Sequence, residues 1–384
     1  MGIQHFYRDT WAEINLDNIY YNVESLKNIL PENVALFAVV KANAYGHGDI
    51  QVARTAVRAG ASYIAVALMD EAVALRQKGL QEPVLVLGAS RPEDVSLAAE
   101  YDITLTVFQK EWIVKAKEYL NDSKPVKLHI KVDSGMGRIG VKTKQELREV
   151  EEAIRENACF YLEGVFTHFA TADQVDRTYY KKQLALFKEL VDSFEERPEL
   201  VHSSNSAASL RYPESYFNGA RLGISMYGLS PSKEIEVELP YPLKEAFSLR
   251  TKLVHVKEVE PGDKVGYGAT YEAKAKEWIG TLPIGYADGW IRKLSGQEVL
   301  VDGKRVPIAG RICMDQTMIK LPYQLPLGTE VTLIGNQGDE FISVNEIAET
   351  LETINYEIVC MMSNRVPRVF IQDDKIVEVV NGLF

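Results

Sequence analysis

The sequence predicts an α/β fold in which an eight-stranded (β/α)8 barrel is followed by a mostly β C-terminal domain. Over the first two thirds of the chain, short apolar segments rich in β-branched residues alternate with segments of helical period. Beyond about Tyr241, alternating strand-like segments dominate, and turn signals such as Asp302-Gly303 separate them. We therefore expect the barrel to span residues 1–240 and the β domain to span residues 241–384.

Eight apolar segments are the predicted barrel strands. Strands that alternate with helices in this number favour a closed barrel over an open sheet. The GxGxxG fingerprint that a dinucleotide-binding sheet would carry after its first strand is also absent. The predicted strands are Ala35–Lys41, Tyr63–Leu68, Pro83–Gly88, Ile103–Phe108, Val126–Asp133, Leu162–Phe169, Leu200–Ser204 and Ala220–Tyr227. The predicted helices between them are Asp49–Ala59, Asp70–Lys78, Pro92–Tyr101, Gln109–Leu120, Thr143–Glu156 and Thr178–Glu195.

The β domain is predicted from segments with alternating polarity and from the turns between them. One short helix is expected after Ser343, because Glu346 follows it at the spacing of a capping box. The predicted strands are Ser248–Glu258, Glu277–Ile284, Glu298–Arg305, Thr317–Leu321, Glu330–Ile334 and Val366–Val380.

Composition excludes several classes of function. The chain has 384 residues, of which 46% are hydrophobic and 25% are charged, as in ordinary globular proteins. Its formal net charge of -11 argues against a nucleic-acid partner or an anionic membrane. The three cysteines are widely spaced, which is typical of reduced thiols in a cytoplasm. No signal peptide or membrane span is apparent, so we expect a cytoplasmic protein with no membrane partner.

Polar residues stand at the ends of several predicted strands. Lys41 ends the first strand, and it is either a solvated strand end or an amine desolvated so that it can form a Schiff base. Lys131 and Asp133 end the fifth strand, His168 ends the sixth, and Arg221 lies on the eighth. In barrels of this kind the chemistry lies at the carboxyl ends of the strands, so these side chains are expected to converge on one rim.

Other chemistries find little support in the sequence. The six histidines show no HxxxH pair and the cysteines show no CxxC pair, so no protein-built metal site is expected. There is no GxSxG elbow. A helix that begins near Ser206 would point free backbone N–H groups at an anion. Together with Lys41 and Arg221, such a helix fits a phosphorylated aldehyde cofactor.

The stretch AVVKANAYGHG, which contains Lys41, resembles the pyridoxal-phosphate lysine signature of bacterial alanine racemases. The segments KVDSGMGRIG, FTHFATAD, HSSNSAA, ARLGISMYG, VGYGATY and GRICMDQ follow in the order and at the spacing of that family. The resemblance covers nearly the whole chain. It implies a barrel followed by a β domain, a homodimer with shared active sites, and the interconversion of L-alanine and D-alanine, which supplies D-alanine for peptidoglycan.

The resemblance also implies how pyridoxal phosphate is held. Lys41 would bind it as a Schiff base, His168 would stack beside its ring, and Arg221 would face the pyridine nitrogen. The residues implied as phosphate contacts, or as lying near the phosphate, are Tyr45, Ser206, Gly223, Ile224 and Tyr356.

Further roles concern the substrate. Arg138 and the Met314 backbone amide match the groups that bind the substrate carboxylate. Lys131 aligns with a lysine that carries a carbamate in many members, which holds Arg138 in place. Racemisation removes a proton from one face of Cα and returns one to the other, so a second acid/base is needed, and the resemblance assigns Tyr267. In the family, the domain that carries this tyrosine reaches the active site of the partner subunit.

Three alternatives remain at this stage. A non-catalytic pyridoxal-phosphate carrier would use the same lysine and barrel, but such proteins usually lack the tyrosine-bearing β domain. A basic-amino-acid decarboxylase would place an acidic residue where Arg221 stands. A broad-specificity amino-acid racemase would keep all of the catalytic residues and would differ in its substrate pocket.

Overall fold

The computed structural model describes residues 6–120 and 124–383. The sequence-based expectation about a signal peptide rests partly on residues 1–5, which lie outside the described residues. The chain forms two compact units. One unit comprises Asn18–Ala44 and Asp49–Lys244, and the other comprises the residues up to Asp17, the short segment Tyr45–Gly48 and the residues from Glu245 onward.

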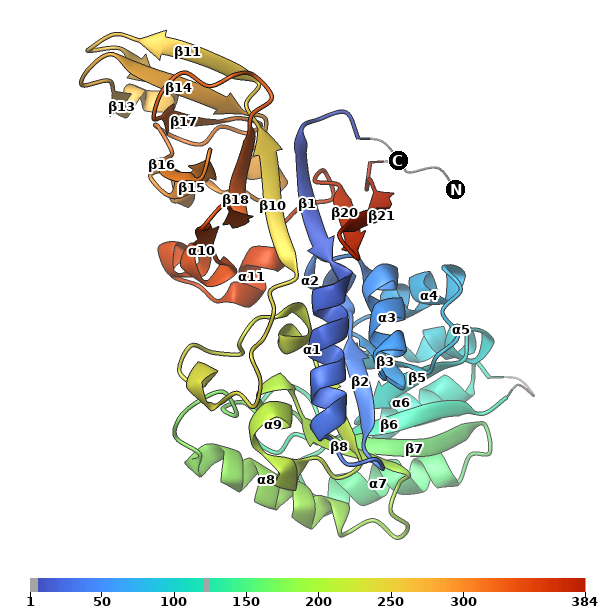
Figure 1. Ribbon diagram of the computed structural model, residues 1–384. Helices are drawn as coiled ribbons and strands as arrows, with labels where there is room; N and C mark the ends of the chain where they lie inside the picture. Colours follow the sequence, from blue (N-terminus) through green and yellow to red (C-terminus); the bar gives the residue numbers. More distant parts are fainter. Residues whose placement is uncertain (1–5, 121–123, 384) are drawn as a thin grey trace. The chain divides into compact units, whose positions relative to one another are not determined.

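In the described part of the first unit, eight parallel strands close into a barrel in sequence order (Figure 1). The barrel closes because β2 pairs with β3 on one side and with β9 on the other. The predicted (β/α)8 barrel is therefore confirmed; β8 has the predicted bounds, and the other strands are shorter than expected or shifted by a few residues. The strands are β2 (Ala35–Val39), β3 (Tyr63–Val66), β4 (Val84–Ala89), β5 (Ile103–Val107), β6 (Val126–Lys131), β7 (Phe160–Phe166), β8 (Leu200–Ser204) and β9 (Gly219–Leu222).

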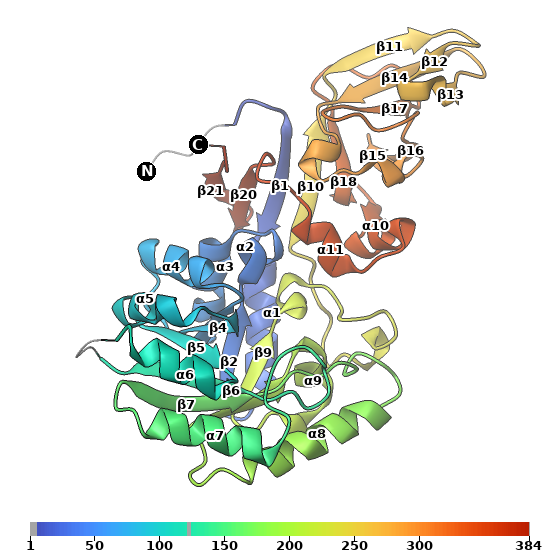
Figure 2. The ribbon, with the colours of Figure 1, turned by 180° about the vertical axis from the view of Figure 1, so that it is seen from behind.

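Helices connect the strands, and Figure 2 shows α6, α7 and α8 along the outside of the barrel. Their apolar faces are buried and their other faces carry charges, as in α7, where Leu147, Val150 and Ile154 are buried. All of the predicted helices are present. They are α3 (Asp49–Arg58), α4 (Met69–Gln77), η1 with α5 (Pro92–Asp94 and Val95–Glu100), α6 (Lys110–Lys117), α7 (Lys144–Arg155), α8 (Thr178–Val191) and the short α9 (Ser206–Arg211). A further helix, α1 (Leu16–Ile29), was not predicted.

The second unit is built on β-sheets. Its largest sheet has the order β16-β15-β18-β10-β1-β20-β21, and β19 pairs with β18. A second sheet has the order β11-β14-β17, and β12 pairs with β13. The strands are β1 (Thr10–Asn15), β10 (Phe247–Lys252), β11 (His255–Val259), β12 (Lys264–Val265), β13 (Tyr271–Glu272), β14 (Glu277–Leu282), β15 (Glu298–Val301), β16 (Lys304–Pro307), β17 (Thr317–Leu321), β18 (Glu330–Gln337), β19 (Glu340–Ile342), β20 (Arg368–Gln372) and β21 (Lys375–Val380). The short helices are α10 (Val344–Leu351) and α11 (Asn355–Cys360).

The N-terminal strand differs from the sequence prediction, which placed residues 1–240 together. β1 lies between β10 and β20 in the large sheet of the second unit, antiparallel to the first and parallel to the second. Its sequence TWAEIN gave no sign of this pairing, because the partner strands lie more than 200 residues away along the chain. The described residues 6–17 therefore belong with the β unit.

In the β unit, the predicted turns are present, whereas the predicted strands agree less well with the structure. Asp302-Gly303 forms the predicted hairpin, in which Val301 pairs with Lys304, and the Ser343 hydroxyl caps α10 by accepting from the Glu346 amide at 3.0 Å. The predicted strand Ser248–Glu258 is wrong as a single strand, because β10 and β11 belong to different sheets.

The barrel interior contains aromatic and polar side chains as well as aliphatic ones. Phe37 stacks on Tyr63 and on His202, with ring centroids 4.6 and 4.7 Å apart. A Cβ on Gly164 would lie 2.7 Å from the His129 ring, so this strand position admits only glycine. In a buried polar interior of this kind, most polar groups are expected to have hydrogen-bond partners.

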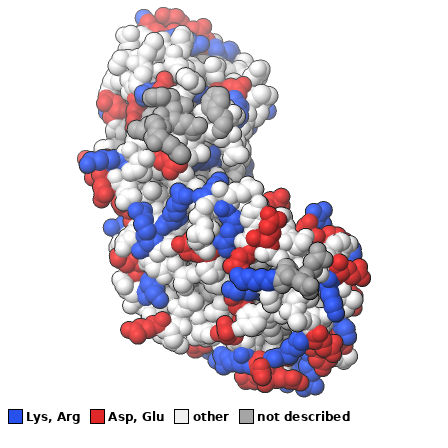
Figure 3. All heavy atoms as spheres, turned by 90° about the vertical axis from the view of Figure 1, so that its right-hand side faces the viewer, with Lys and Arg blue, Asp and Glu red and all other residues white. Residues whose placement is uncertain are grey.

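The surface mixes both signs of charge. On the face shown in Figure 3, lysine and arginine side chains lie among aspartate and glutamate side chains. Within residues 6–120 and 124–383, no helix has the length and apolar character that a membrane crossing requires. Cys159, Cys313 and Cys360 are all free thiols.

Candidate active site

The residue predicted to bind the cofactor, Lys41, begins an unusual turn at the end of β2. Ala42, Asn43, Ala44 and Tyr45 all have φ between 51° and 53°, in the left-handed region. Left-handed residues other than glycine normally occur singly and cost about 1–2 kcal/mol each. A run of four concentrates strain next to Lys41, as is common where a functional side chain must point in one direction.

Two side chains that the sequence analysis missed hold this turn. Glu71 accepts a hydrogen bond from the Ala42 amide at 2.6 Å, and its other oxygen accepts from the Ala67 and Leu68 amides. The Asn43 side chain accepts from the Asp49 amide at 3.0 Å and so ties the turn to the start of α3. Nothing in the sequence around Glu71 distinguishes it from other acidic residues in the first turn of a helix.

β2 is also anchored by the segment that follows its neighbour β9. The buried Tyr227 hydroxyl donates to the Val39 carbonyl at 2.9 Å, two residues before Lys41. Tyr227 ends the 3-10 turn η3 (Ile224–Tyr227), which follows β9. The strand end that carries Lys41 is therefore fixed from neighbouring parts of the barrel.

The predicted rim is electropositive. Burial lowers the pKa of His168 well below its usual value, and the charges of Arg221, Lys131, Arg138 and Lys41 lower it further. Because burial and these basic groups all disfavour its charged form, the imidazole remains neutral at pH 7. The barrel unit thus brings together the strand-end residues that the sequence analysis expected to converge.

Lys131 is a deeply buried member of this group of basic residues. Its side chain is only 3% exposed, and its amine lies 4.5 Å from the centre of the Phe166 ring. Among the described residues, the Lys131 amine has no hydrogen-bond partner. Burial, followed by the charges of Arg221 and Arg138, lowers the pKa of Lys131 well below its usual value, which favours a neutral amine.

Asp133 shapes the loop that carries Arg138. Its carboxylate accepts hydrogen bonds from the Gly135 and Gly137 amides at 3.1 and 2.9 Å. Burial alone would raise the pKa of Asp133, but these amides hold it below its usual value. A Cβ on Gly140 would lie 2.3 Å from the Asp133 nitrogen, so the loop closes only with glycine there. Arg138 is exposed at the end of this ordered loop.

Arg221 is buried in the barrel with only 3% of its surface exposed. Its two terminal nitrogens donate to the Thr167, Ser203 and His202 carbonyls and to Nδ1 of His202. Burial lowers the pKa of Arg221 to about 9, which still leaves the guanidinium protonated at pH 7. In the described residues none of these hydrogen-bond partners is a carboxylate.

The ends of β8 and β9 are joined by the residues predicted to contact a phosphate. The Gly223 amide donates to the Ser206 hydroxyl at 2.8 Å. Asn205 caps α9 by accepting from the Ala208 amide at 3.1 Å, so α9 begins at Ser206 as the sequence predicted. Ile224 opens the 3-10 turn η3 directly after Gly223.

The β unit carries the other predicted site residues. The rings of Tyr45 and Tyr356 lie 6.1 Å apart and are tilted by 50°. Burial raises the pKa of Tyr45 above its usual value, so its hydroxyl stays protonated. The Gly46 carbonyl accepts from Arg368, and a Cβ on Gly46 would lie 2.1 Å from the Val359 carbonyl oxygen.

Tyr267 begins the 3-10 turn η5 (Tyr267–Ala269), between β12 and β13. Glycines flank it at Gly266 and Gly268, both with positive φ. The side chain of Tyr267 is 70% exposed and that of Met314 is 53% exposed. Both predicted residues therefore present large side chains at the surface of this chain.

The backbone at Met314 is held by a buried carboxylate. The Tyr286 and Ala287 amides donate to the Cys313 and Met314 carbonyls at 3.0 and 3.1 Å. Tyr286 and Ala287 belong to the 3-10 turn η6 (Tyr286–Asp288), which Asp288 ends. The Asp288 carboxylate accepts a hydrogen bond from the Gly285 amide. A Cβ on Gly285 would lie 2.3 Å from the Cys313 carbonyl oxygen.

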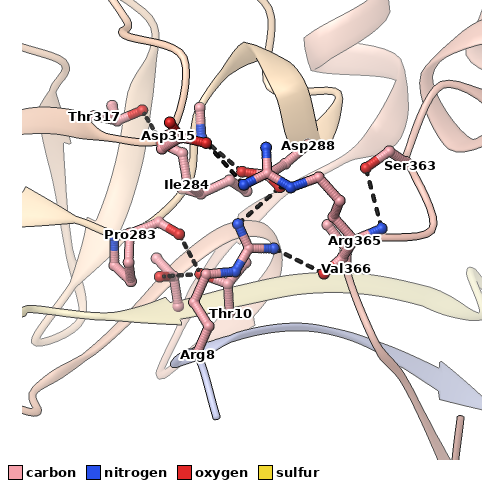
Figure 4. A network of polar contacts seen from close by, with 12 residues as sticks. Arg8, Thr10, Pro283, Ile284, Asp288, Asp315, Thr317, Ser363, Arg365 and Val366 are labelled. Atoms are coloured by element: carbon pink, nitrogen blue, oxygen red, sulfur yellow. Dashed lines mark hydrogen bonds and ion pairs between the residues drawn. The ribbon is translucent and has the colours of Figure 1, made fainter. Parts of the chain in front are cut away.

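Two arginines complete the support of this turn, as Figure 4 shows. Arg8 donates to the Asp288 carboxylate at 2.7 Å, and Arg365 lies 3.6 Å from the same carboxylate. Arg365 also pairs with Asp315 at 2.7 Å. Because Asp288 is fully buried, this pairing compensates a charge that would otherwise be costly. It fixes the segment from Cys313 to Asp315.

The donor set of the barrel rim fits pyridoxal phosphate. An anionic ligand suits the basic side chains of Lys41, Arg138 and Arg221 beside a neutral histidine. Lys41 is a primary amine at a strand end, and Arg221 offers donors only. In residues 6–120 and 124–383 no cluster of histidine, cysteine and acidic side chains is arranged to hold a metal ion.

Comparison with known proteins agrees with this fit. The family model described as the alanine racemase N-terminal domain matches residues 14–231, and the model for the alanine racemase C-terminal domain matches residues 246–370. The chain belongs to the alanine racemase family. It is accordingly an amino-acid racemase, an isomerase of a pyridoxal-phosphate-dependent family.

The relatives described next align with this chain over nearly all of its length. The alanine racemase of Geobacillus stearothermophilus is 57% identical over 378 residues, which cover 98% of this chain and 97% of that protein. Alanine racemase 1 of Bacillus subtilis is 52% identical and covers 100% of this chain and 98% of that protein. The crystal structure of alanine racemase from Bacillus anthracis with bound L-Ala-P is 53% identical, covers 99% of each chain and superposes with a TM-score of 0.96.

The left-handed turn of this racemase yields a test of backbone strain. Ala42 is exposed, so Ala42→Gly removes only a Cβ that is disfavoured at positive φ. We expect this change to stabilise the protein by about 1 kcal/mol, because glycine adopts the left-handed region freely. The control Ala74→Gly, inside α4, should destabilise it by a similar amount. Denaturant unfolding measures both, and destabilisation by Ala42→Gly would contradict the strained turn.

Proposed function

We propose that this chain interconverts L-alanine and D-alanine with pyridoxal phosphate bound covalently through Lys41. The observation that carries the proposal is the gathering of Lys41, Lys131, Arg138 and Arg221 around His168 on one barrel rim. The full-length similarity to proteins named alanine racemase supports alanine as the substrate.

Two lysines on the rim could hold the cofactor, and the surroundings favour Lys41. Lys131 is nearly fully buried against Phe166, which leaves no room for a ring bound to its amine. Lys41 is only half-buried, and the strained turn that follows it keeps its side chain at the strand end. The motif AVVKANAYGHG supports the same choice.

The remaining contacts follow from the chemistry of each side chain. When bound, pyridoxal phosphate supplies an electron sink that acidifies the α-hydrogen of an amino acid. Arg221 has only donors, so it hydrogen-bonds an unprotonated ring nitrogen. His168, neutral at pH 7, would stack beside the ring. The residues that would contact the phosphate or lie near it are Tyr45, Ser206, Gly223, Ile224 and Tyr356.

The substrate carboxylate is proposed to bind Arg138 and the Met314 backbone amide. A guanidinium on an ordered loop and an amide on a backbone fixed by Asp288 provide two donors of defined position. Binding the carboxylate in this way orients the two faces of Cα toward the two acid/base groups.

Lys41 and Tyr267 are the proposed acid/base pair. One accepts the α-proton from one face of Cα, and the other donates a proton to the opposite face. The 70% exposure of the Tyr267 side chain supports a role in a site that another subunit completes. We therefore propose a homodimer in which the β domain, residues 241–384, contributes Tyr267 and Met314 to the partner's barrel.

The cellular setting belongs to the proposal as well. Three free cysteines suit a reducing compartment, so we propose a cytoplasmic enzyme. Its D-alanine product would supply peptidoglycan synthesis. A net charge of -11 suits a small-molecule substrate rather than a nucleic acid.

A second candidate is a racemase of broader specificity. A solved structure titled histidine racemase, from Leuconostoc mesenteroides, is 33% identical to this chain, covers 97% of it and has a TM-score of 0.89. This architecture therefore also occurs in a protein named for a much larger substrate side chain.

The function is tested by incubating the holoenzyme with each L-amino acid and measuring the D-isomer by chiral chromatography. We expect D-alanine to form at least about tenfold faster than any other D-amino acid, because each extra methylene in a closed pocket changes the barrier by about 1–3 kcal/mol. Lys41→Ala serves as the inactive control. Comparable rates for several side chains would select the broad-specificity candidate, and no D-isomer from any substrate would contradict the racemase.

Shared active sites are tested by mixing two inactive variants. A mixed dimer of Lys41→Ala and Tyr267→Phe would contain one site with both residues intact, so subunit exchange should recover about one quarter of wild-type activity. The control mixes Lys41→Ala with the double variant Lys41→Ala/Tyr267→Phe and should stay inactive. Exchange demonstrated by native mass spectrometry without recovered activity would show that each site lies within one chain.

The proposed carbamate on Lys131 is tested with labelled bicarbonate. The neutral amine attacks carbon dioxide, forms an N–C bond and releases one proton, and Arg138 and Arg221 stabilise the resulting anion. Protein equilibrated with 13C-bicarbonate should show a carbamate resonance that is absent from Lys131→Ala. Spectra without this resonance in wild-type protein would contradict the modification.

A further inference from the structure

A continuous line of hydrogen bonds crosses the barrel interior from Arg221 to a carboxylate. Arg221 Nη1 lies 2.7 Å from Nδ1 of His202. His202 Nε2 lies 3.0 Å from Nδ1 of His129, and His129 Nε2 lies 3.0 Å from Oε2 of Glu163. The four residues come from β9, β8, β6 and β7, so the line runs through the barrel rather than along one strand.

All four side chains are removed from water. His129 and His202 are fully buried, Arg221 is 3% exposed and Glu163 is 5% exposed. Glu163 is also held by the Tyr63 hydroxyl at 2.5 Å and by the Lys127 amine at 3.0 Å. A buried polar network of this kind is tolerated only when each donor meets an acceptor.

Hydrogen-bond chemistry determines the direction of every link. A guanidinium has donors only, so Nδ1 of His202 must accept, and the proton of a neutral His202 must lie on Nε2. That proton points at Nδ1 of His129, which must therefore accept and carry its own proton on Nε2. The Nε2 proton of His129 is then donated to Glu163, which as a carboxylate only accepts.

The charge states support this direction. Burial lowers the pKa of both histidines, so each is neutral and carries one ring proton at pH 7. Burial alone would raise the pKa of Glu163, but the hydrogen bond from His129 and its other donors hold it below its usual value. The line thus joins a buried cation to a buried anion through two neutral rings.

We infer that Glu163 and His129 are positioning residues that hold His202 in the tautomer that accepts from Arg221, and thereby fix the guanidinium at the rim. The part of this inference that concerns the cofactor ring nitrogen rests on the proposed function. The tautomer of each histidine does not, because it depends only on groups within the barrel.

The opposite tautomers would remove the hydrogen bond between Arg221 and His202. If His202 carried its proton on Nδ1, that proton would meet the Arg221 N–H, and two donors would face each other at 2.7 Å. Removing the acceptor at position 163 leaves the buried Nε2 proton of His129 without a partner, so Arg221 alone then favours these tautomers and the second constraint on the line is lost.

The first test observes the tautomers in the wild-type protein, and substitutions in the line serve only to assign the signals. Protein labelled with 15N-histidine is examined by NMR at neutral pH, and the signals of His129 and His202 are assigned from spectra of His129→Gln and His202→Gln. We expect both rings to be neutral with the proton on Nε2. A proton on Nδ1 of either ring, or an imidazolium at either position, would overturn the inference, whether or not the chain is a racemase.

The second test separates hydrogen bonding from charge. Glu163→Gln keeps an acceptor oxygen and should preserve both tautomers, whereas Glu163→Leu removes the acceptor and should give mixed tautomers. Glu163→Leu should also lower kcat for alanine about tenfold, with KM changed little, because substrate-carboxylate binders are untouched. Tyr63→Phe, which removes another donor to Glu163, is the matched control and should retain kcat.

The outcomes distinguish the inference from the proposed function. Unchanged kcat and tautomers in a folded Glu163→Leu protein would overturn the positioning role. If Glu163→Leu does not fold, equal loss of kcat in Glu163→Gln and Tyr63→Phe would overturn it, because Tyr63→Phe leaves the line intact. Wild-type protein with the expected tautomers but no racemase activity would contradict the proposed function alone.

Discussion

The accumulation of positive charge at the carboxyl end of the barrel is the constraint on which the rest of the site depends. Burial, followed by the basic groups of Arg221, Lys131, Arg138 and Lys41, lowers the pKa of His168 and holds the ring neutral. Asp133 also acts on Lys131, but its carboxylate oxygen Oδ1 is engaged by two backbone amides. Gathering basic groups at one rim costs free energy in the protein without a ligand, and binding an anion there offsets this cost.

Among the described residues of the barrel, Arg221 is oriented by a series of hydrogen bonds and not by a direct ion pair. Arg221 donates to carbonyls and to His202, and hydrogen bonds through His202 and His129 connect it to Glu163, a carboxylate that also pairs with Lys127. A carboxylate placed directly against Arg221 would compete with a ligand for the guanidinium. Two intervening neutral rings leave Arg221 oriented and still available as a donor at the rim.

Much of the barrel and its rim could be predicted from the sequence, because both follow from local signals. Strand-like segments that end in Lys41, Lys131 and His168 indicate a common edge once a parallel barrel is assumed. Glu71 and the left-handed turn could not be predicted, because neither leaves a pattern in neighbouring residues. The same holds for β1 and for the line from Arg221 to Glu163, which join residues far apart in the chain. The mechanistic roles came from the family motifs rather than from local patterns.

The central claim is that Lys41, and not the more deeply buried Lys131, carries the cofactor. Its most direct test is to reduce the holoprotein with borohydride, digest it and locate the pyridoxyl group by mass spectrometry. The account predicts the label on Lys41 alone, with Lys131 unlabelled even though its amine is the one that burial keeps neutral. A pyridoxyl group on Lys131, or on any lysine away from the rim, would contradict it.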